Sequence, residues 1–183
     1  MICFYNDWVI NFDLAFFDFK KLMWYNEHYL RARSTDDLLP EVKAQVEDAG
    51  YTGFDDAYIS SVIDLMRDRA QKISEFVEQG IYFFKAPESY DEKTLKKAWK
   101  EGVSALVTEF TEAAAGVEDF NAVNVKEAFS GVLNKHEIGF GKLGRPVRLA
   151  VTGIGFGPDL FETMALLGKD ETLARLKKAV EVL

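Results

Sequence analysis

The sequence predicts an all-α protein built from two helical subdomains. Almost every segment from residue 18 onward has apolar residues at the three- and four-residue spacing of an amphipathic helix. Capping residues, glycines and prolines separate these segments into helices of ordinary length. Outside residues 1–17 no stretch has the pattern of a strand. Residues 85–91, with a proline and several polar residues, interrupt the helical pattern and predict a linker.

The first predicted subdomain covers residues 18–86 and follows an apolar N-terminal segment, residues 1–17. Asp18 is placed to cap a helix that runs to about Arg33, and Pro40 suits the first position of a helix that ends at Gly50. Asp55 opens a third helix, and a fourth is expected over residues 72–84. The third helix has one clearly apolar face, made of Ile59, Val62, Ile63 and Met66.

The second predicted subdomain covers residues 87–183. A helix starts at Glu92 and ends at Gly116, with Gly102 as a candidate break. Three further amphipathic segments follow. Their predicted boundaries are residues typical of helix ends, namely Asn124, Pro158, Gly168 and Asp170.

Composition favours binding over catalysis. Cys3 is the only cysteine, which excludes an internal disulfide and a thiolate zinc site. His28 and His136 have no metal-ligand spacing around them, and no phosphate-binding loop or nucleophile–base pair is present. His28 beside Glu27 is expected to form a surface pair. No apolar window reaches the length of a membrane span, and the N-terminal segment makes a poor signal peptide.

Residues 141–158 stand out by charge. The formal net charge of the chain is -8, yet this glycine-rich stretch contains Lys142, Arg145 and Arg148 and no acidic residue. Two interpretations stay open from charge alone. The stretch is either a turn between helices whose cations face water, or a surface offered to an anionic partner.

Arginines also stand beside apolar and aromatic residues elsewhere. Arg69 continues the apolar face of the third helix, and Leu160 and Phe161 follow the acid-free stretch. Single-stranded RNA is bound by such combinations, since bases stack on apolar surfaces and arginine pairs with base edges or phosphates. The alternatives are an ion pair of Arg69 with Glu75 or Asp68, and ordinary core packing of the two apolar residues.

Three ordered motifs resemble the C-terminal anticodon-binding region of bacterial glutamyl-tRNA synthetases, which are class I aminoacyl-tRNA synthetases. The resemblance covers residues 17–183 and leaves the N-terminal segment unmatched. The motifs are Phe17-Asp18-Phe19-Lys20-Lys21-Leu22-Met23-Trp24-Tyr25-Asn26, Leu65-Met66-Arg67-Asp68-Arg69, and Arg145-Pro146-Val147-Arg148-Leu149-Ala150-Val151-Thr152-Gly153 with Gly157-Pro158-Asp159-Leu160-Phe161-Glu162 and Leu166-Leu167-Gly168-Lys169-Asp170.

The resemblance implies a two-part helix cage, hinged near Pro87, that binds the anticodon loop of the glutamate tRNA. In this family an arginine at the position of Arg69 reads the third anticodon base, cytosine in the glutamate tRNA and guanine in the glutamine tRNA. Arg69 therefore favours an enzyme that discriminates between them. Arg148 matches the position of a second arginine that reads the anticodon in this family. Leu160 matches the position of an apolar residue that contacts a base. Arg67 lies in the motif that faces the anticodon, and Arg145, which departs from the family pattern, is expected to contact phosphate.

The resemblance also implies what this chain does not carry. The family's catalytic domain holds ATP with a His-x-Gly-His type motif and a Lys-x-x-Lys-Ser type loop, and neither is present in the sequence. We therefore expect no catalytic residue, metal or cofactor in this chain, with ATP and Mg²⁺ belonging to the missing domain. We also expect a cytoplasmic monomer without membrane contact. The alternative is a helical protein-interaction module of the same fold that no longer binds tRNA.

Overall fold

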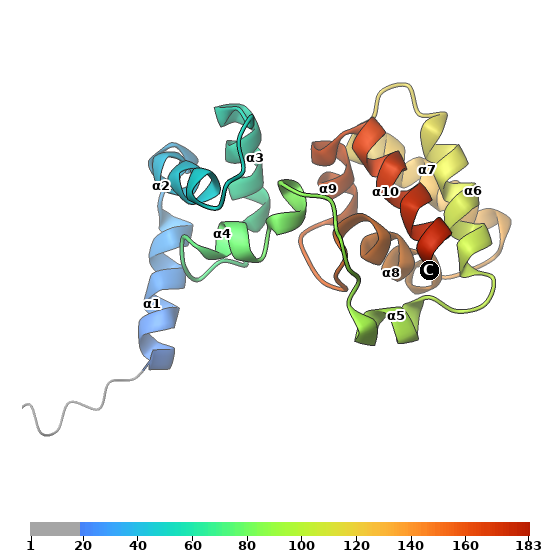
Figure 1. Ribbon diagram of the computed structural model, residues 1–183, viewed down its shortest axis with the longest axis horizontal. Coiled ribbons are helices and arrows are strands. Elements are labelled where there is room, and N and C mark those ends of the chain that lie inside the picture. The colour runs from blue at the N-terminus through green and yellow to red at the C-terminus, as the bar shows by residue number, and fades with distance from the viewer. Residues whose placement is uncertain (1–18) are drawn as a thin grey trace, which may run out of the picture.

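The structure, a computed structural model, describes residues 19–183 as ten α-helices and one short 3₁₀ helix (Figure 1). That range contains no strand, so the predicted all-α class is confirmed for it. The N-terminal segment at 1–17 and the cap predicted at Asp18 lie outside the described residues.

The first half of the chain packs around one apolar cluster. It contains α1 (Phe19–Ala32), α2 (Thr35–Asp48), α3 (Asp56–Met66), the single turn α4 (Glu75–Glu78) and the 3₁₀ helix η2 (Ile81–Phe83). Asp55 caps α3 as predicted, with its carboxylate accepting from the Tyr58 amide at 2.7 Å. The predicted face of α3 is buried. The cluster is completed by Leu30, Leu38, Val42, Val46, Ala70, Phe76, Val77, Tyr82, Phe83 and Phe84.

Two predictions for this half are wrong in detail. The second helix begins before Pro40, because Ser34 and Asp37 form a reciprocal capping box that starts α2 and leaves the proline inside it. The helix expected over residues 72–84 is split into α4 and η2 at Gly80. A side chain at Gly80 would place its Cβ 2.3 Å from the Phe76 carbonyl oxygen, so only glycine fits this close approach.

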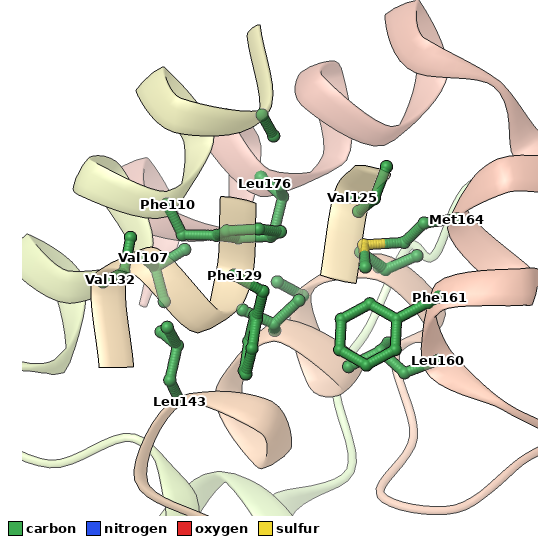
Figure 2. Packing of buried hydrophobic residues seen from close by; sticks show 14 of the residues in the cluster. Val107, Phe110, Val125, Phe129, Val132, Leu143, Leu160, Phe161, Met164 and Leu176 are labelled. Atoms are coloured by element: carbon green, nitrogen blue, oxygen red, sulfur yellow. The ribbon is translucent and has the colours of Figure 1, made fainter. Parts of the chain in front are cut away.

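The second half packs six helices around a larger cluster. They are α5 (Glu92–Ala98), α6 (Val103–Ala115), α7 (Ala122–Lys135), α8 (Phe140–Thr152), α9 (Leu160–Leu167) and α10 (Lys169–Val182). Figure 2 shows Phe110, Phe129 and Phe161, which come from α6, α7 and α9, in the same cluster. The ring centroid of Phe129 lies 5.2 Å from that of Phe110 and 5.3 Å from that of Phe161. Both pairs are edge-to-face, an arrangement that aromatic rings favour.

In this half the helix ends predicted at glycines are confirmed, whereas the predicted helix starts differ from those in the structure. Gly102, in the left-handed region with φ of 83°, separates α5 from α6, and Gly116 ends α6. The N-caps of α7 and α10 are Asn121 and Gly168 rather than the predicted Asn124 and Asp170. Asp159 caps α9, so Pro158 precedes the first turn of that helix instead of lying in it. Asn121 accepts from the backbone amide of Asn124, so the predicted residue takes part in the cap as a donor.

The acid-free stretch is mostly helix, which corrects the expectation of a turn. Residues 140–152 form α8, with Pro146 inside it, and only residues 153–159 form a loop. Gly144 lies inside the helix under the ring of Phe140, which would have to move if a Cβ were added 2.4 Å from it. The stretch therefore presents its cations from a rigid element.

One buried arginine joins the two halves. Arg175 on α10 donates from Nη1 to the carbonyl oxygens of Tyr82 at 2.7 Å and of Val151 at 2.9 Å, and from Nε to Glu171 at 2.7 Å. Only 4% of its side chain is exposed. Leu167 packs against both apolar clusters. The halves are therefore in contact, while the boundary at residue 87 stays a prediction.

Candidate nucleic-acid interface

Arg148 lies on α8 with its guanidinium partly buried between the two halves. Its Nη1 atom is shielded from solvent and has no hydrogen-bond partner among residues 19–183. Burial lowers the pKa of Arg148, and the positive charge of Arg69 lowers it further, while Tyr82 and Asp159 act in the opposite direction. A buried donor without an acceptor is costly, and in native proteins it usually marks a place where a ligand binds or a water is held.

Tyr82 is the buried neighbour of Arg148. Its side chain is 1% exposed, and its hydroxyl has only a weak acceptor, the Met66 sulfur at 3.7 Å. Burial raises the pKa of Tyr82 to about 12. A Cβ at Gly157 would lie 3.0 Å from Arg148 Nη1 and 3.2 Å from the Tyr82 hydroxyl. The Gly157 backbone therefore closes over both polar groups without covering them with a side chain.

Arg69 brings a second cation from the first half of the molecule. It follows the end of α3, is exposed, and its side chain has no hydrogen bond or ion pair within the described part of the chain. The two alternative partners are used elsewhere. Glu75 accepts from the Gln71 amide at 2.7 Å, and Asp68 lies 3.4 Å from Arg31. Arg69 acts on the titration of both Arg148 and Tyr82, so these three residues form one electrostatic cluster.

Arg145 lies one turn before Arg148 on α8. It is exposed and has no hydrogen bond or ion pair within residues 19–183. Residues three apart on a helix lie on the same side. Arg145 therefore extends the cationic surface beyond the cluster and is well placed to meet an anion.

Arg67 is not brought into this surface. Its Nη1 donates to the carbonyl oxygen of Arg33 at 2.9 Å, and its Nη2 donates to the Thr35 hydroxyl and lies 3.2 Å from Asp64. These contacts tie the end of α3 to the corner between α1 and α2. Both terminal nitrogens of Arg67 are therefore occupied, while its buried Nε has no partner within the described residues.

Leu160 lies in the core of the second half. Its side chain is 2% exposed and belongs to the cluster shown in Figure 2, as does the 5%-exposed Phe161. The burial of both side chains favours ordinary core packing, so in this conformation Leu160 presents no surface on which a base can stack.

Sequence reasoning missed Tyr82 as a member of the site. The only signal was a tyrosine within the apolar run Ile81–Phe84, and a hydroxyl in such a run requires a partner when buried.

The described residues do not support a metal site or a membrane-spanning helix. Within residues 19–183 no group of three or more His, Cys, Asp or Glu could hold a metal ion. Among the described helices none is long and apolar enough to cross a membrane.

The class of protein follows from the fold and a family comparison. Residues 26–180 match the family model of an anticodon binding domain. The helical architecture of the described residues agrees with that class.

The individual relatives and the solved structure that match this chain are glutamate–tRNA ligases. The chain is 39% identical over 169 residues to the glutamate–tRNA ligase of Christiangramia forsetii and 36% identical over 173 residues to that of Bacteroides thetaiotaomicron. Both alignments cover 92% of this chain and 33% of the relative. The crystal structure of a glutamate tRNA ligase from Elizabethkingia meningosepticum superimposes with a TM-score of 0.86 and 36% identity, over 91% of this chain and 33% of that one.

The chain belongs to the family of anticodon-binding domains that glutamate–tRNA ligases carry. It spans about one third of the length of these relatives.

Proposed function

We propose that this chain binds the anticodon loop of a glutamate tRNA at the Arg69–Arg148–Tyr82 cluster. The observation that carries the proposal is the buried Nη1 of Arg148, which has no partner within the described residues. An RNA base edge or phosphate supplies the missing acceptor, and arginine presents a planar fork suited to either. The like charge of Arg69 nearby strengthens the attraction for an anion.

Within this proposal each arginine has a distinct task. Arg69, exposed and free to move, reads the third anticodon base, as the family resemblance implies. Arg148 is half-buried and holds the loop against α8. Arg145 contacts a phosphate and carries no base information. Leu160 has no direct contact with the RNA, because its side chain lies in the core. We expect no ATP-dependent ligation of glutamate by this chain alone, since the catalytic motifs are missing from its sequence.

A binding titration tests the proposal. The full 183-residue chain is titrated with a fluorescent anticodon stem-loop of glutamate tRNA at several salt concentrations. We expect saturable binding that weakens with salt, and weaker binding when the third anticodon base is changed from cytosine to guanine. A stem-loop of the same length with a scrambled loop is the control. The competing function, a helical protein-interaction module, predicts no saturable binding of either RNA at low salt.

A further inference from the structure

A second cationic surface lies at the far end of α8 from the arginine cluster. A cavity of about 610 Å³ opens between the α5–α6 connection, α6 and the start of α8. Lys97, Lys100 and Lys142 line it, and all three side chains are exposed. None of the three has a hydrogen bond or ion pair within residues 19–183, although Lys97 attracts Asp91 at longer range. The cavity therefore offers three cations whose charges are not neutralised by a close partner.

The acidic residues at the cavity do not cancel these charges. Glu109 has both carboxylate oxygens occupied, with Lys135 Nζ at 2.8 Å and His136 Nε2 at 2.7 Å. The hydrogen bond from Lys135 is the largest cause of a lowered pKa of Glu109, so the carboxylate stays ionised and paired. Glu101 is exposed at the rim and is the remaining acid among the lining residues. The lining has a net positive charge in a chain whose net charge is -8.

The cavity lining also has an apolar part. Aliphatic residues account for part of the lining, and a less polar surrounding strengthens the attraction of the lysines for an anion: Ala98, Val103, Ala105, Leu106 and Ile138.

Helix α8 carries Lys142, which lines the cavity, as well as Arg148 of the arginine cluster. Lys142, Arg145 and Arg148 follow each other at three-residue spacing, which places neighbours on adjoining parts of one helix surface. With a rise of 1.5 Å per residue, Lys142 lies about 9 Å from Arg148 along the helix axis. An RNA strand that leaves Arg148 along α8 thus passes Arg145 and reaches the cavity.

We infer that the Lys97–Lys100–Lys142 cavity binds phosphates of the tRNA strand that flanks the anticodon loop. The inference rests on the proposed function, and extends it from base reading to a backbone-binding site. Phosphate contacts of this kind fix the register of the RNA without reading its sequence. An acidic protein segment is less favoured as the occupant, because the cations continue directly into the cluster proposed to bind RNA.

The test uses a double variant, Lys100→Gln with Lys142→Gln, and a matched control, Lys126→Gln with Lys177→Gln. The control lysines are exposed and unpaired within the described residues but lie outside the cavity. The dissociation constant of the anticodon stem-loop is measured against salt concentration for all three proteins. Each lost phosphate contact lowers the slope of log K against log salt by about 0.7–0.9, so the cavity variant is expected to lose about 1.5.

Three outcomes decide the matter. A reduced slope in the cavity variant, the same for cytosine and guanine at the third base and absent from the control, supports the inference. A wild-type protein that binds the RNA while the cavity variant keeps its full slope overturns the inference but leaves the proposed function intact, and opens the cavity to an acidic protein partner. Absence of saturable binding by the wild-type protein overturns both.

Discussion

The Nη1 atom of Arg175 donates to the carbonyl oxygen of Tyr82 at 2.7 Å, although 93 residues separate them in sequence. The same nitrogen donates to Val151 at 2.9 Å, three residues beyond Arg148. One buried guanidinium therefore fixes the backbone beside Tyr82 relative to the backbone beside Arg148. The geometry of the candidate site depends on this contact between the two halves as well as on the linker.

Replacing Arg175 with methionine is expected to lower the free energy of unfolding by about 2–4 kcal/mol, because two buried carbonyl oxygens lose their donor. Urea unfolding followed by circular dichroism measures the loss. Lys177→Met on the same helix, an exposed position, serves as the control. An equal effect of the two substitutions would show that the Arg175 contacts contribute no net stability.

Replacing Arg69 with glutamine is expected to reduce discrimination between cytosine and guanine at the third anticodon base by about 1–3 kcal/mol, if the arginine reads the base through two hydrogen bonds. The measured quantity is the ratio of dissociation constants for two stem-loops that differ only at that base. Unfolding should be unaffected, since Arg69 has no side-chain partner within residues 19–183. An equal loss of affinity for both RNAs would contradict a base-reading role of Arg69.

Replacing Arg145 with alanine is expected to weaken binding of both stem-loops equally and to lower the salt slope by about 0.7–0.9, the effect of one phosphate contact. Arg145 is exposed, so the folded state should be unaffected. The same salt series used for the wild-type protein supplies the measurement. A change in the cytosine-to-guanine ratio would contradict a pure phosphate role.

Replacing Gly157 with alanine is expected to displace Arg148 from Tyr82. The new Cβ would lie 3.0 Å from Arg148 Nη1, at a backbone φ of 150° that L residues rarely adopt, with a cost of about 1–3 kcal/mol in stability. RNA affinity should fall as well. Gly131→Ala in α7 is the control, since a Cβ there meets nothing within 4 Å and should stabilise the helix by about 1 kcal/mol. Unchanged affinity in the Gly157 variant would exclude a tight fit around Arg148.

Stability is expected to fall as pH rises from about 10 to 12. Burial raises the pKa of both Tyr82 and Tyr58 to about 12, whereas tyrosine in an unfolded chain titrates near 10. In that interval the unfolded chain releases protons that the folded chain retains, so higher pH favours unfolding. Urea midpoints across the interval measure the effect. Tyr82→Phe should reduce the dependence, while Tyr29→Phe, at a position 67% exposed, should leave it unchanged.

The sequence was sufficient for the all-α class and for the buried face of α3. Apolar residues at helical spacing identified the core side of α3, because burial of one face is what makes such a spacing necessary. Helix starts were less predictable. Asn121 and Asn124 are equally good capping residues by type, and the choice between them depends on backbone geometry over three residues.

The sequence could not predict where close packing interrupts a helix or allows a helix to continue. Gly80 splits a segment with helical periodicity because its backbone approaches the Phe76 carbonyl oxygen. Gly144 does the opposite, since it allows α8 to continue under the ring of Phe140 in a stretch whose glycines suggested a turn. Each effect depends on a neighbour whose position is known only once the chain has folded locally.

The candidate site was predicted in part. The family resemblance indicated Arg69 and Arg148, and the structure places them in one electrostatic cluster from opposite halves of the chain. Spacing could not show that Arg67 is occupied by the α1–α2 corner, or that Tyr82 completes the cluster. Those facts arise from interactions between residues 13 to 66 positions apart in sequence, for which local periodicity carries no information.

The unpaired guanidinium of Arg148 has a consequence for the lifetime of the protein. Arg148 Nη1 has no acceptor within the described residues and Arg69 adds a second positive charge to the cluster, so an anion bound there would lower the free energy of the folded state. A ligand that binds only the folded state stabilises it in proportion to its concentration. If RNA is that ligand, occupancy protects the domain from proteolysis, and the amount of surviving protein follows the supply of its tRNA.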